Sequence, residues 1–221
     1  MYEAILLSLK ITGIATLITS ITGIITAYIF TKYNFRAKNI LETVILMPMA
    51  LPPTVVGYII LLVIGKRGLI GSFLYKYFEI NILFTWQAAC IAAMIVSFPL
   101  VFQNAKTAFN YVGSSIKDAA RVDGANEFQL FFFIILPVAM NGILGGILLA
   151  FVRALGEFGA TLIVAGNIPG KTQTMSLLIY FSIGSGDTRT ANILVLLIIV
   201  ISMSLVLLTN RLLKKGNVHR E

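Results

Sequence analysis

Residues suited to docking against another protein lie within residues 118–137, where a polar stretch of helical character runs into an apolar one. Asp118 is followed by Ala119 and Ala120, and Gly124 comes four residues later. Small alanines let a short helix sit deep in the cleft of another protein, and Gly124 permits a sharp reversal after that helix. Asp118 near the helix start suits the positive end of the helix dipole. This pattern predicts a docking surface, and the alternative is an ordinary amphipathic surface helix.

Arg153 and Glu157 are a second candidate site, because they fall four residues apart on one helical face. Gly156 and Gly159 flank the acid and predict a break in the helix there. Charges at membrane depth are candidates for function. The pair is predicted either to anchor an outer gate or docking site, or only to neutralise its two charges near the interface.

Residues 165–172 read AGNIPGKT, which fits a relaxed phosphate-binding pattern. A loop that cradles phosphate needs a strand before it and a helix after it in an α/β domain. Here the flanks are apolar spans, and Pro169 removes one N–H that the cradle would use. We therefore expect an exposed turn and no nucleotide site.

Metal and covalent chemistry are not predicted. The single Cys90 lies in an apolar run and the single His219 in the tail, so no Cys/His cluster exists for a metal. A membrane-embedded enzyme would need several acids, His or Cys inside its spans, and Glu157 is the only acid near a span interior. No cofactor is expected, and the dispersed basic residues argue against nucleic acid.

The composition predicts an all-α, polytopic membrane protein. Of 221 residues, 58% are hydrophobic and 12% are charged, which is too apolar for a soluble domain. The net charge of +8 is typical of basic loops beside anionic headgroups. We expect one transmembrane domain over residues 1–221, with residues 106–129 as a cytoplasmic loop.

Five spans are long enough to cross a bilayer as helices, at residues 4–30, 40–64, 83–105, 131–152 and 190–213. The second contains Pro48, Pro52 and Pro53, which predict a kink that faces protein or a cavity. Residues 65–81 are expected to be a polar and aromatic connection. Residues 175–183 are apolar but too short to span, so a re-entrant or interfacial piece is expected.

The fourth span contains Gly142 and Gly146, a G-x-x-x-G that allows close helix packing. Pro137 fits the first turn of this helix, where no N–H partner is needed. If residues 106–129 face the cytoplasm, the amino terminus is outside and the tail is inside. Ten of the 17 basic residues are then inside, in agreement with the positive-inside rule.

The docking stretch resembles the EAA loop of ABC-transporter membrane permeases, of the form E-A-A-x3-G-x9-I-x-L-P. Every spacing fits through Ile134, Leu136 and Pro137, with Asp118 where Glu is usual. In that family the loop docks into the cytoplasmic ATPase. The resemblance therefore implies a set of residues that couple the chain to an ATPase, namely Asp118, Ala119, Ala120, Arg121, Gly124 and Ala125.

Four other stretches, at residues 47–58, 65–71, 153–161 and 167–174, resemble the molybdate permeases of the same superfamily. Sulfate and tungstate permeases share the L-G-E-F-G-A segment and the Pro-rich second span. The resemblance implies a permease with the type I ABC importer fold in the cell membrane, which carries molybdate or tungstate and is not itself an enzyme. A sulfate or thiosulfate permease is the alternative.

The resemblance also implies two cytoplasmic ATPase subunits, an external oxyanion-binding protein and a second copy of the chain. Five spans line only half a channel, which independently favours a homodimer. Hydroxyls, backbone N–H groups and broken helix ends can coordinate an anion. We expect the pathway or gate to include Pro52, Pro53, Thr54, Ser97, Gly156, Glu157, Phe158, Gly159 and Thr161.

Two alternatives remain for these residues and for the chain. Thr54, Ser97 and Thr161 also fit ordinary packing hydroxyls, which are common in membrane helices. An ion-driven secondary transporter or channel would show inverted repeats or intramembrane ionisable pairs, and neither is evident in the sequence.

Overall fold

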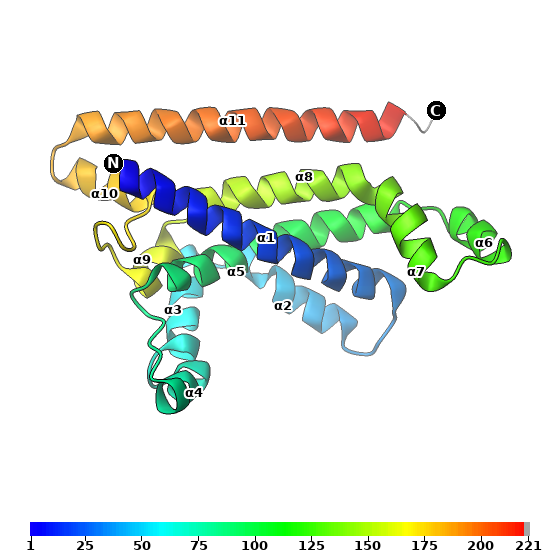
Figure 1. The fold of residues 1–221 in the computed structure, drawn as a ribbon, viewed down its shortest axis with the longest axis horizontal. Helices are drawn as coiled ribbons and strands as arrows, with labels where there is room; N and C mark the ends of the chain where they lie inside the picture. Colours follow the sequence, from blue (N-terminus) through cyan, green and yellow to red (C-terminus); the bar gives the residue numbers. More distant parts are fainter. Residues whose placement is uncertain (219–221) are drawn as a thin grey trace.

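The computed structural model describes residues 1–218, and this part of the chain consists of helices joined by turns. Four long helices run side by side along the longest axis of the molecule (Figure 1): α1 (Tyr2–Lys32), α5 (Trp86–Asn110), α8 (Leu136–Leu155) and α11 (Thr188–Val218). The shorter elements are α2 (Lys38–Ala50), α3 (Pro53–Ile64), α4 (Leu69–Phe78), α6 (Ser114–Val122), α7 (Glu127–Gln129), the π-helix η1 (Leu130–Ile135), α9 (Gly159–Ala165) and α10 (Met175–Gly184).

Five helical stretches of the described chain are long and apolar enough to cross a membrane, as the sequence predicts. They are Tyr2–Lys32, Pro53–Phe78, Trp86–Asn110, Glu127–Leu155 and Thr188–Leu213. Four of them match the predicted spans. The second differs, because the prediction placed it at residues 40–64.

The second predicted span is broken into two helices and not merely kinked. After α2 ends at Ala50, Leu51 is extended, with ψ 146°, and Pro52 has ψ 137°. Neither Pro52 nor Pro53 has an N–H to continue the helix, and a proline disfavours the helical region for the residue before it. As a result α3 turns away from the direction of the long helices (Figure 1).

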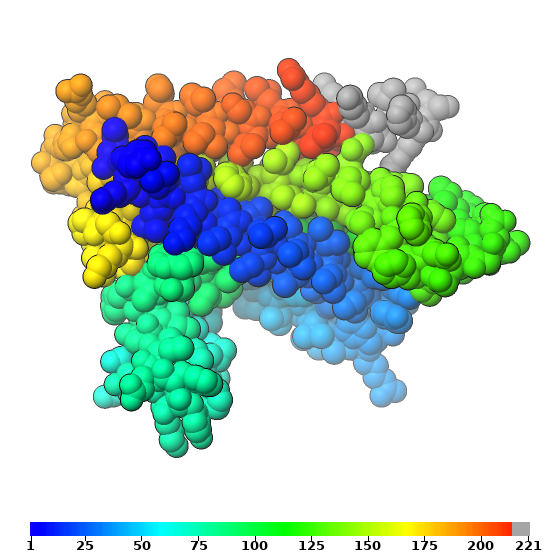
Figure 2. Space-filling view, in the orientation of Figure 1, coloured from blue at the N-terminus to red at the C-terminus, as the bar shows by residue number. Residues whose placement is uncertain are grey.

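The connection predicted over residues 65–81 also contains a helix, α4. Gly71 packs so closely on the end of α3 that a Cβ there would lie 2.1 Å from the carbonyl oxygen of Gly65. The sequence analysis assigned no helix to this connection, and the structure places α4 within it. In the space-filling view, α3 and α4 form an arm that projects from the body of the molecule (Figure 2).

The fourth span begins earlier than predicted. Asn126 and Gln129 form a capping box at the start of α7, and the helical rod continues through η1 into α8. Pro137 therefore lies in the first turn of α8, as predicted, but α7 and η1 continue the helical rod before it. The wider π-helical turns just before Pro137 fit the loss of one N–H, as π-bulges and prolines do elsewhere.

The third span extends further than predicted, because α5 runs to Asn110 and contains Pro99 in its middle. Asn104 remains inside this helix and donates its side-chain amide to the Leu100 carbonyl at 2.8 Å. A Cβ on Gly146 would lie 2.6 Å from the Cβ of Asn104, and one on Gly142 would lie 2.7 Å from the Cβ of Ala108. The predicted close packing at the G-x-x-x-G is confirmed, and α5 is the helix that it contacts.

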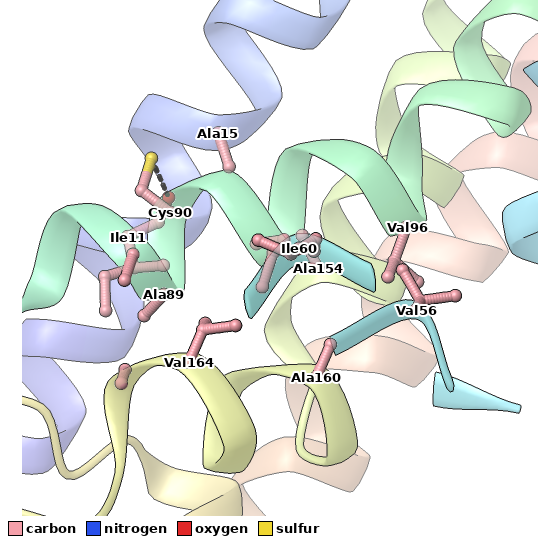
Figure 3. Packing of buried hydrophobic residues seen from close by; sticks show 14 of the residues in the cluster. Ile11, Ala15, Val56, Ile60, Ala89, Cys90, Val96, Ala154, Ala160 and Val164 are labelled. Atoms are coloured by element: carbon pink, nitrogen blue, oxygen red, sulfur yellow. Dashed lines mark hydrogen bonds between the residues drawn. The ribbon is translucent and has the colours of Figure 1, made fainter. Parts of the chain in front are cut away.

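Small side chains hold the helices together at two main buried clusters. Figure 3 shows the first, in which residues such as Ile11 of α1, Ala89 of α5 and Val164 of α9 form one cluster with Val56 and Ile60 of α3. The second cluster joins α1, α5 and α8 near α6 and includes Phe102, Phe109 and Ala120. A smaller group links α8, α10 and α11. Alanine-rich faces of this kind let helix backbones approach closely.

The amino terminus and the described end of α11 lie at opposite ends of the molecule (Figure 1), as the predicted topology requires. The amino terminus lies at the end of the molecule opposite α6, while the described end of α11 lies at the same end as α6 (Figure 1). The predicted short apolar piece forms α10, whose 10 residues are too few to span a bilayer. His219 and Arg220 lie outside the described residues.

Candidate functional site

The elbow between α8 and α9 contains the predicted charged pair. Helix α8 ends at Leu155, and Gly156, Glu157 and Phe158 lie between it and α9, so the predicted break is confirmed. The Arg153 guanidinium donates to Oε2 of Glu157 at 2.8 Å. Glu157 is only 3% exposed, so its charge needs the protein partners that it has.

The second oxygen of the Glu157 carboxylate caps α9. Oε1 accepts a hydrogen bond from the backbone N–H of Ala160 at 2.8 Å. This N–H lies at the start of a helix, where amides lack partners within the helix and a negative charge is favourable. The carboxylate therefore fixes the angle between α8 and α9, and it neutralises Arg153 at the same time.

The Pro-rich turn lies directly against this elbow. A Cβ on Gly159 would lie 2.9 Å from the Cβ of Pro53 and 3.4 Å from the Thr54 nitrogen. One turn further on, a Cβ on Gly57 would lie 2.7 Å from the Cα of Ala160. Thus two stretches about 100 residues apart in sequence meet backbone to backbone, at the start of α3 and the start of α9.

Most of the predicted pathway residues therefore come together. Pro52, Pro53, Thr54 and Gly156 are exposed around this contact, while Glu157 and Gly159 are buried in it. Phe158 lies against the ring of Tyr180 from α10, with ring centroids 5.1 Å apart.

Ser97 is not part of this group. It is fully buried on α5, and its hydroxyl donates to the Ala93 carbonyl at 2.7 Å. This geometry matches the packing alternative for Ser97. Thr161 is also buried, but it lines a small cavity of about 10 Å³ together with Ser8, Thr12, Glu157 and Thr174, among other residues. That volume suits about one water molecule.

The sequence analysis did not predict a row of buried hydroxyl side chains on α1. Ser8, Thr12, Thr16 and Ser20 follow one another at steps of four residues, and Thr19 lies beside them. The hydroxyls of Thr16 and Thr19 have no hydrogen-bond partner among the described residues. The four-residue spacing of Ser and Thr inside an apolar span was the pattern that could have revealed this row.

The predicted docking stretch forms α6, at the opposite end of the molecule from the elbow (Figure 1). Gly124 has φ +86°, so the chain does reverse there in a conformation that favours glycine. Asp118, however, lies in the middle of α6, and α6 has no acid in its first turn. The proposed match of Asp118 to the helix dipole is therefore wrong, and Asp118 instead pairs with Arg121 at 3.2 Å.

The two alanines of this stretch point in different directions. Ala119 is exposed, whereas Ala120 is buried against the α1–α5–α8 cluster. Ala125 is partly buried against the same cluster. Ala120 therefore attaches α6 to its own chain, and the outer surface of α6 is formed by Ala119 with Ile116 and the 87% exposed Val122.

The phosphate-loop pattern at residues 165–172 has no cradle geometry. The Thr172 hydroxyl accepts from the Ile168 N–H at 3.0 Å and donates to the Gly166 carbonyl, so it closes the turn on itself. Helix α10 begins only at Met175, after the N-cap Thr174. Among the described residues, no group of three or more His, Cys, Asp or Glu could hold a metal ion.

Comparison with known proteins gives one family over most of the chain. The model of the family described as "Binding-protein-dependent transport system inner membrane component" matches residues 19–215. The chain is 41% identical over 201 residues to the putative molybdenum transport system permease protein YvgM of Bacillus subtilis, covering 91% of this chain and 88% of YvgM. It is 39% identical over 208 residues to the molybdenum transport system permease protein ModB of Escherichia coli K12, covering 93% and 91%.

Sulfate permeases are also similar. The sulfate transport system permease protein CysT of E. coli K12 is 31% identical over 199 residues, covering 90% of this chain and 72% of CysT. Among solved structures, a chain of the MetNI methionine ABC transporter in inward-facing conformations superposes with a TM-score of 0.72 at 12% identity, covering 98% of this chain and 95% of that one. A bacterial ABC transporter that imports alginate gives a TM-score of 0.67 at 18% identity, covering 97% and 79%.

Proposed function

This chain belongs to the family of binding-protein-dependent transport system inner membrane components, and we propose that it transports a tetrahedral oxyanion, which is molybdate or tungstate. It is a multi-pass membrane permease of the ABC importer type, with the all-α fold of that class. The observation that carries the substrate proposal is the identity of about 40% to two molybdenum permeases over nine-tenths of the chain. The sulfate permease CysT is less similar in sequence, with 31% identity.

We propose that α6 is the coupling helix, through which the ATPase drives the permease. The proposed coupling residues are Asp118, Ala119, Ala120, Arg121, Gly124 and Ala125. Their roles differ in this proposal. Ala119, together with the exposed Val122, forms the contact surface. Ala120 and Ala125 attach that surface to the bundle, and Gly124 allows the reversal that presents it.

The partners follow from the family. Two ATPase subunits bind at the α6 end, and an external oxyanion-binding protein binds at the opposite end. A second copy of the chain completes the pathway, since one set of five spans encloses only half of a channel. Helix α2 supports this arrangement, because none of its 13 residues is buried within the single chain.

The contact between α3 and α9 is the proposed gate region. The Thr54 hydroxyl and backbone N–H at the exposed start of α3 can bind an oxyanion without a fixed cation. The Arg153–Glu157 pair holds the elbow rigid, so that α3 and α9 move as one body when the ATPases close. The permease then alternates between two states whose balance is set by nucleotide.

Uptake by proteoliposomes tests the substrate proposal. The chain is reconstituted with its ATPase and its binding protein, and radiolabelled molybdate uptake is measured with and without ATP inside the vesicles. The proposal predicts ATP-dependent uptake that excess tungstate abolishes and that equal sulfate leaves largely intact. ATP-dependent sulfate uptake that molybdate does not inhibit would instead favour the sulfate or thiosulfate permease, the second candidate raised by the CysT relatives.

A further inference from the structure

A cavity of about 190 Å³ lies behind α6, on the side that faces the bundle. It is formed where the end of α1, the end of α5, α6, α7 and η1 come together. Its lining consists of Tyr28, Thr31, Lys32, Phe109, Lys117, Arg121, Glu127, Leu130 and Ile135. A volume of roughly 150 Å³ is enough for a benzene-sized ligand, so this cavity has room for a small guest.

The lining carries more positive than negative charge. Glu127 accepts from Lys32 at 2.7 Å and from Arg121 at 3.3 Å, and so it is shared between two cations. Asp118 contacts Arg121 from outside the cavity. Three cations thus meet two carboxylates, and one positive charge is left over.

That charge belongs to Lys117. It is half-buried in the cavity wall, and no described residue forms a hydrogen bond or ion pair with its ammonium group. A partly desolvated charge without a partner is unfavourable, and such groups are normally matched by an anion. Lys117 and Arg121 are four residues apart, so they project from the same face of α6.

Aromatic rings form another part of the wall. The Tyr28 ring is held by Phe131 and Phe109, with centroids 4.4 and 5.8 Å away. An ammonium group with three donors and a guanidinium fork together match a group that presents several oxygens. A tetrahedral oxyanion has such oxygens in every direction.

We propose that this cavity binds a tetrahedral oxyanion group through Lys117, with Lys32 and Arg121 completing the positive surround. The group is either a free anion, such as phosphate or molybdate, or the phosphate of a lipid headgroup. A bound anion would join α6 to the end of α1 and would stiffen the surface that is proposed to receive the ATPase. Placing this site in the cytoplasm rests on the proposed function, but binding itself does not.

Equilibrium dialysis with radiolabelled inorganic phosphate tests the free-anion source. The purified full chain in dodecyl maltoside at low salt is compared with Lys117→Gln, Lys117→Arg and Lys38→Gln. Lys38 is the matched control, because it is an exposed lysine in the α1–α2 region whose ammonium group bonds to Tyr33 and Asn34 outside the cavity. We expect one phosphate per chain, about tenfold weaker binding in Lys117→Gln, and near wild-type binding in the other two.

Native mass spectrometry tests the lipid source. The same variants are released from nanodiscs of phosphatidylglycerol or of phosphatidylcholine, and retained lipids are counted. If a headgroup is the occupant, dialysis with phosphate shows no binding, and one phosphatidylglycerol is retained by wild type but lost by Lys117→Gln. The proposal is overturned if neither probe binds, or if Lys38→Gln lowers binding as much as Lys117→Gln. Neither assay needs the ATPase or transport. The anion-binding proposal can therefore hold even if the uptake experiment fails, and the two failures can be told apart.

Discussion

The Glu157 carboxylate is almost inaccessible to solvent, and protein donors occupy both of its oxygens. The guanidinium of Arg153 is in a more solvent-accessible environment. Its side chain is 34% exposed, so water can replace a lost partner. The two members of the pair should therefore differ in what their removal costs. A carboxylate left buried without its cation is worse off than a cation left partly in water.

Substitution of each member tests this asymmetry. We expect Arg153→Gln to lower the free energy of unfolding by roughly 2–4 kcal/mol, since it leaves a buried carboxylate with one N–H partner. Glu157→Gln should cost about 1–2 kcal/mol, because the amide oxygen can still cap Ala160. Thermal unfolding in detergent measures both.

The double variant is the control for this pair. Replacement of both residues removes the charges together, so its cost should be smaller than the sum of the two single costs. Strictly additive costs, or a larger loss in Glu157→Gln than in Arg153→Gln, would show that the pair does not hold the elbow.

At the scale of helices, the contact between α3 and α9 depends on the absence of a side chain at Gly57. A Cβ there would lie 2.7 Å from the Cα of Ala160, which is backbone and cannot move aside alone. On α1, by contrast, Gly13 is exposed and a Cβ would meet nothing within 4 Å. The chain thus contains two helical glycines with opposite surroundings.

Alanine at these two positions should have opposite effects. Gly13→Ala removes a flexible residue from a helix and should stabilise the protein by about 0.5–1 kcal/mol. Gly57→Ala should destabilise it by about 1–3 kcal/mol through overpacking, and it should slow ATP-driven uptake by separating α3 from α9. Thermal unfolding and proteoliposome uptake measure these effects. A Gly57→Ala chain that is as stable and as active as Gly13→Ala would contradict the proposed gate.

The spans and the elbow could be predicted because each depends on local sequence. Long apolar stretches predicted four of the five spans, and the glycines on either side of Glu157 predicted the break after α8. The reversal at Gly124 was likewise predictable. The backbone has a positive φ there, and glycine adopts a positive φ more readily than other residues.

The remaining features depend on contacts distant in sequence. Nothing local shows that Ala120 faces the bundle while Ala119 faces outward, because both are small and adjacent. The prolines predicted a distortion of the second span, but the direction of α3 is set by its packing on α9. The charge balance of the cavity behind α6 joins Lys32, Lys117 and Glu127 from three helices, so no single stretch of sequence reveals it.

At the scale of the whole molecule, the structure has two distinct ends. The α8–α9 elbow and the amino terminus lie toward one end, while α6, the α1–α2 turn and the described end of α11 lie at the other (Figure 1). The proposed function requires that the first end faces outward and that the second faces the cytoplasm.

Labelling of single cysteines tests this orientation. The only native cysteine, Cys90, is buried and is replaced by alanine. Lys171→Cys, in the exposed turn before α10, should react with a membrane-impermeant maleimide on intact cells, and Val122→Cys should react only after the membrane is opened. Labelling of Val122→Cys on intact cells would show that α6 faces outward, which contradicts the proposed orientation.

Copurification of the ATPase with the permease tests whether α6 is the coupling helix. The wild-type chain is compared with Val122→Glu, which places a charge on the outer surface of α6, and with Ile168→Glu, a control in the turn after α9. Val122 is 87% exposed and Ile168 is 37% exposed, so Val122→Glu should unfold at the wild-type temperature and Ile168→Glu at a slightly lower one. We expect that wild type and Ile168→Glu retain the ATPase and that Val122→Glu loses it. A folded Val122→Glu chain that retains the full amount of ATPase would contradict the assignment of α6 as the coupling helix.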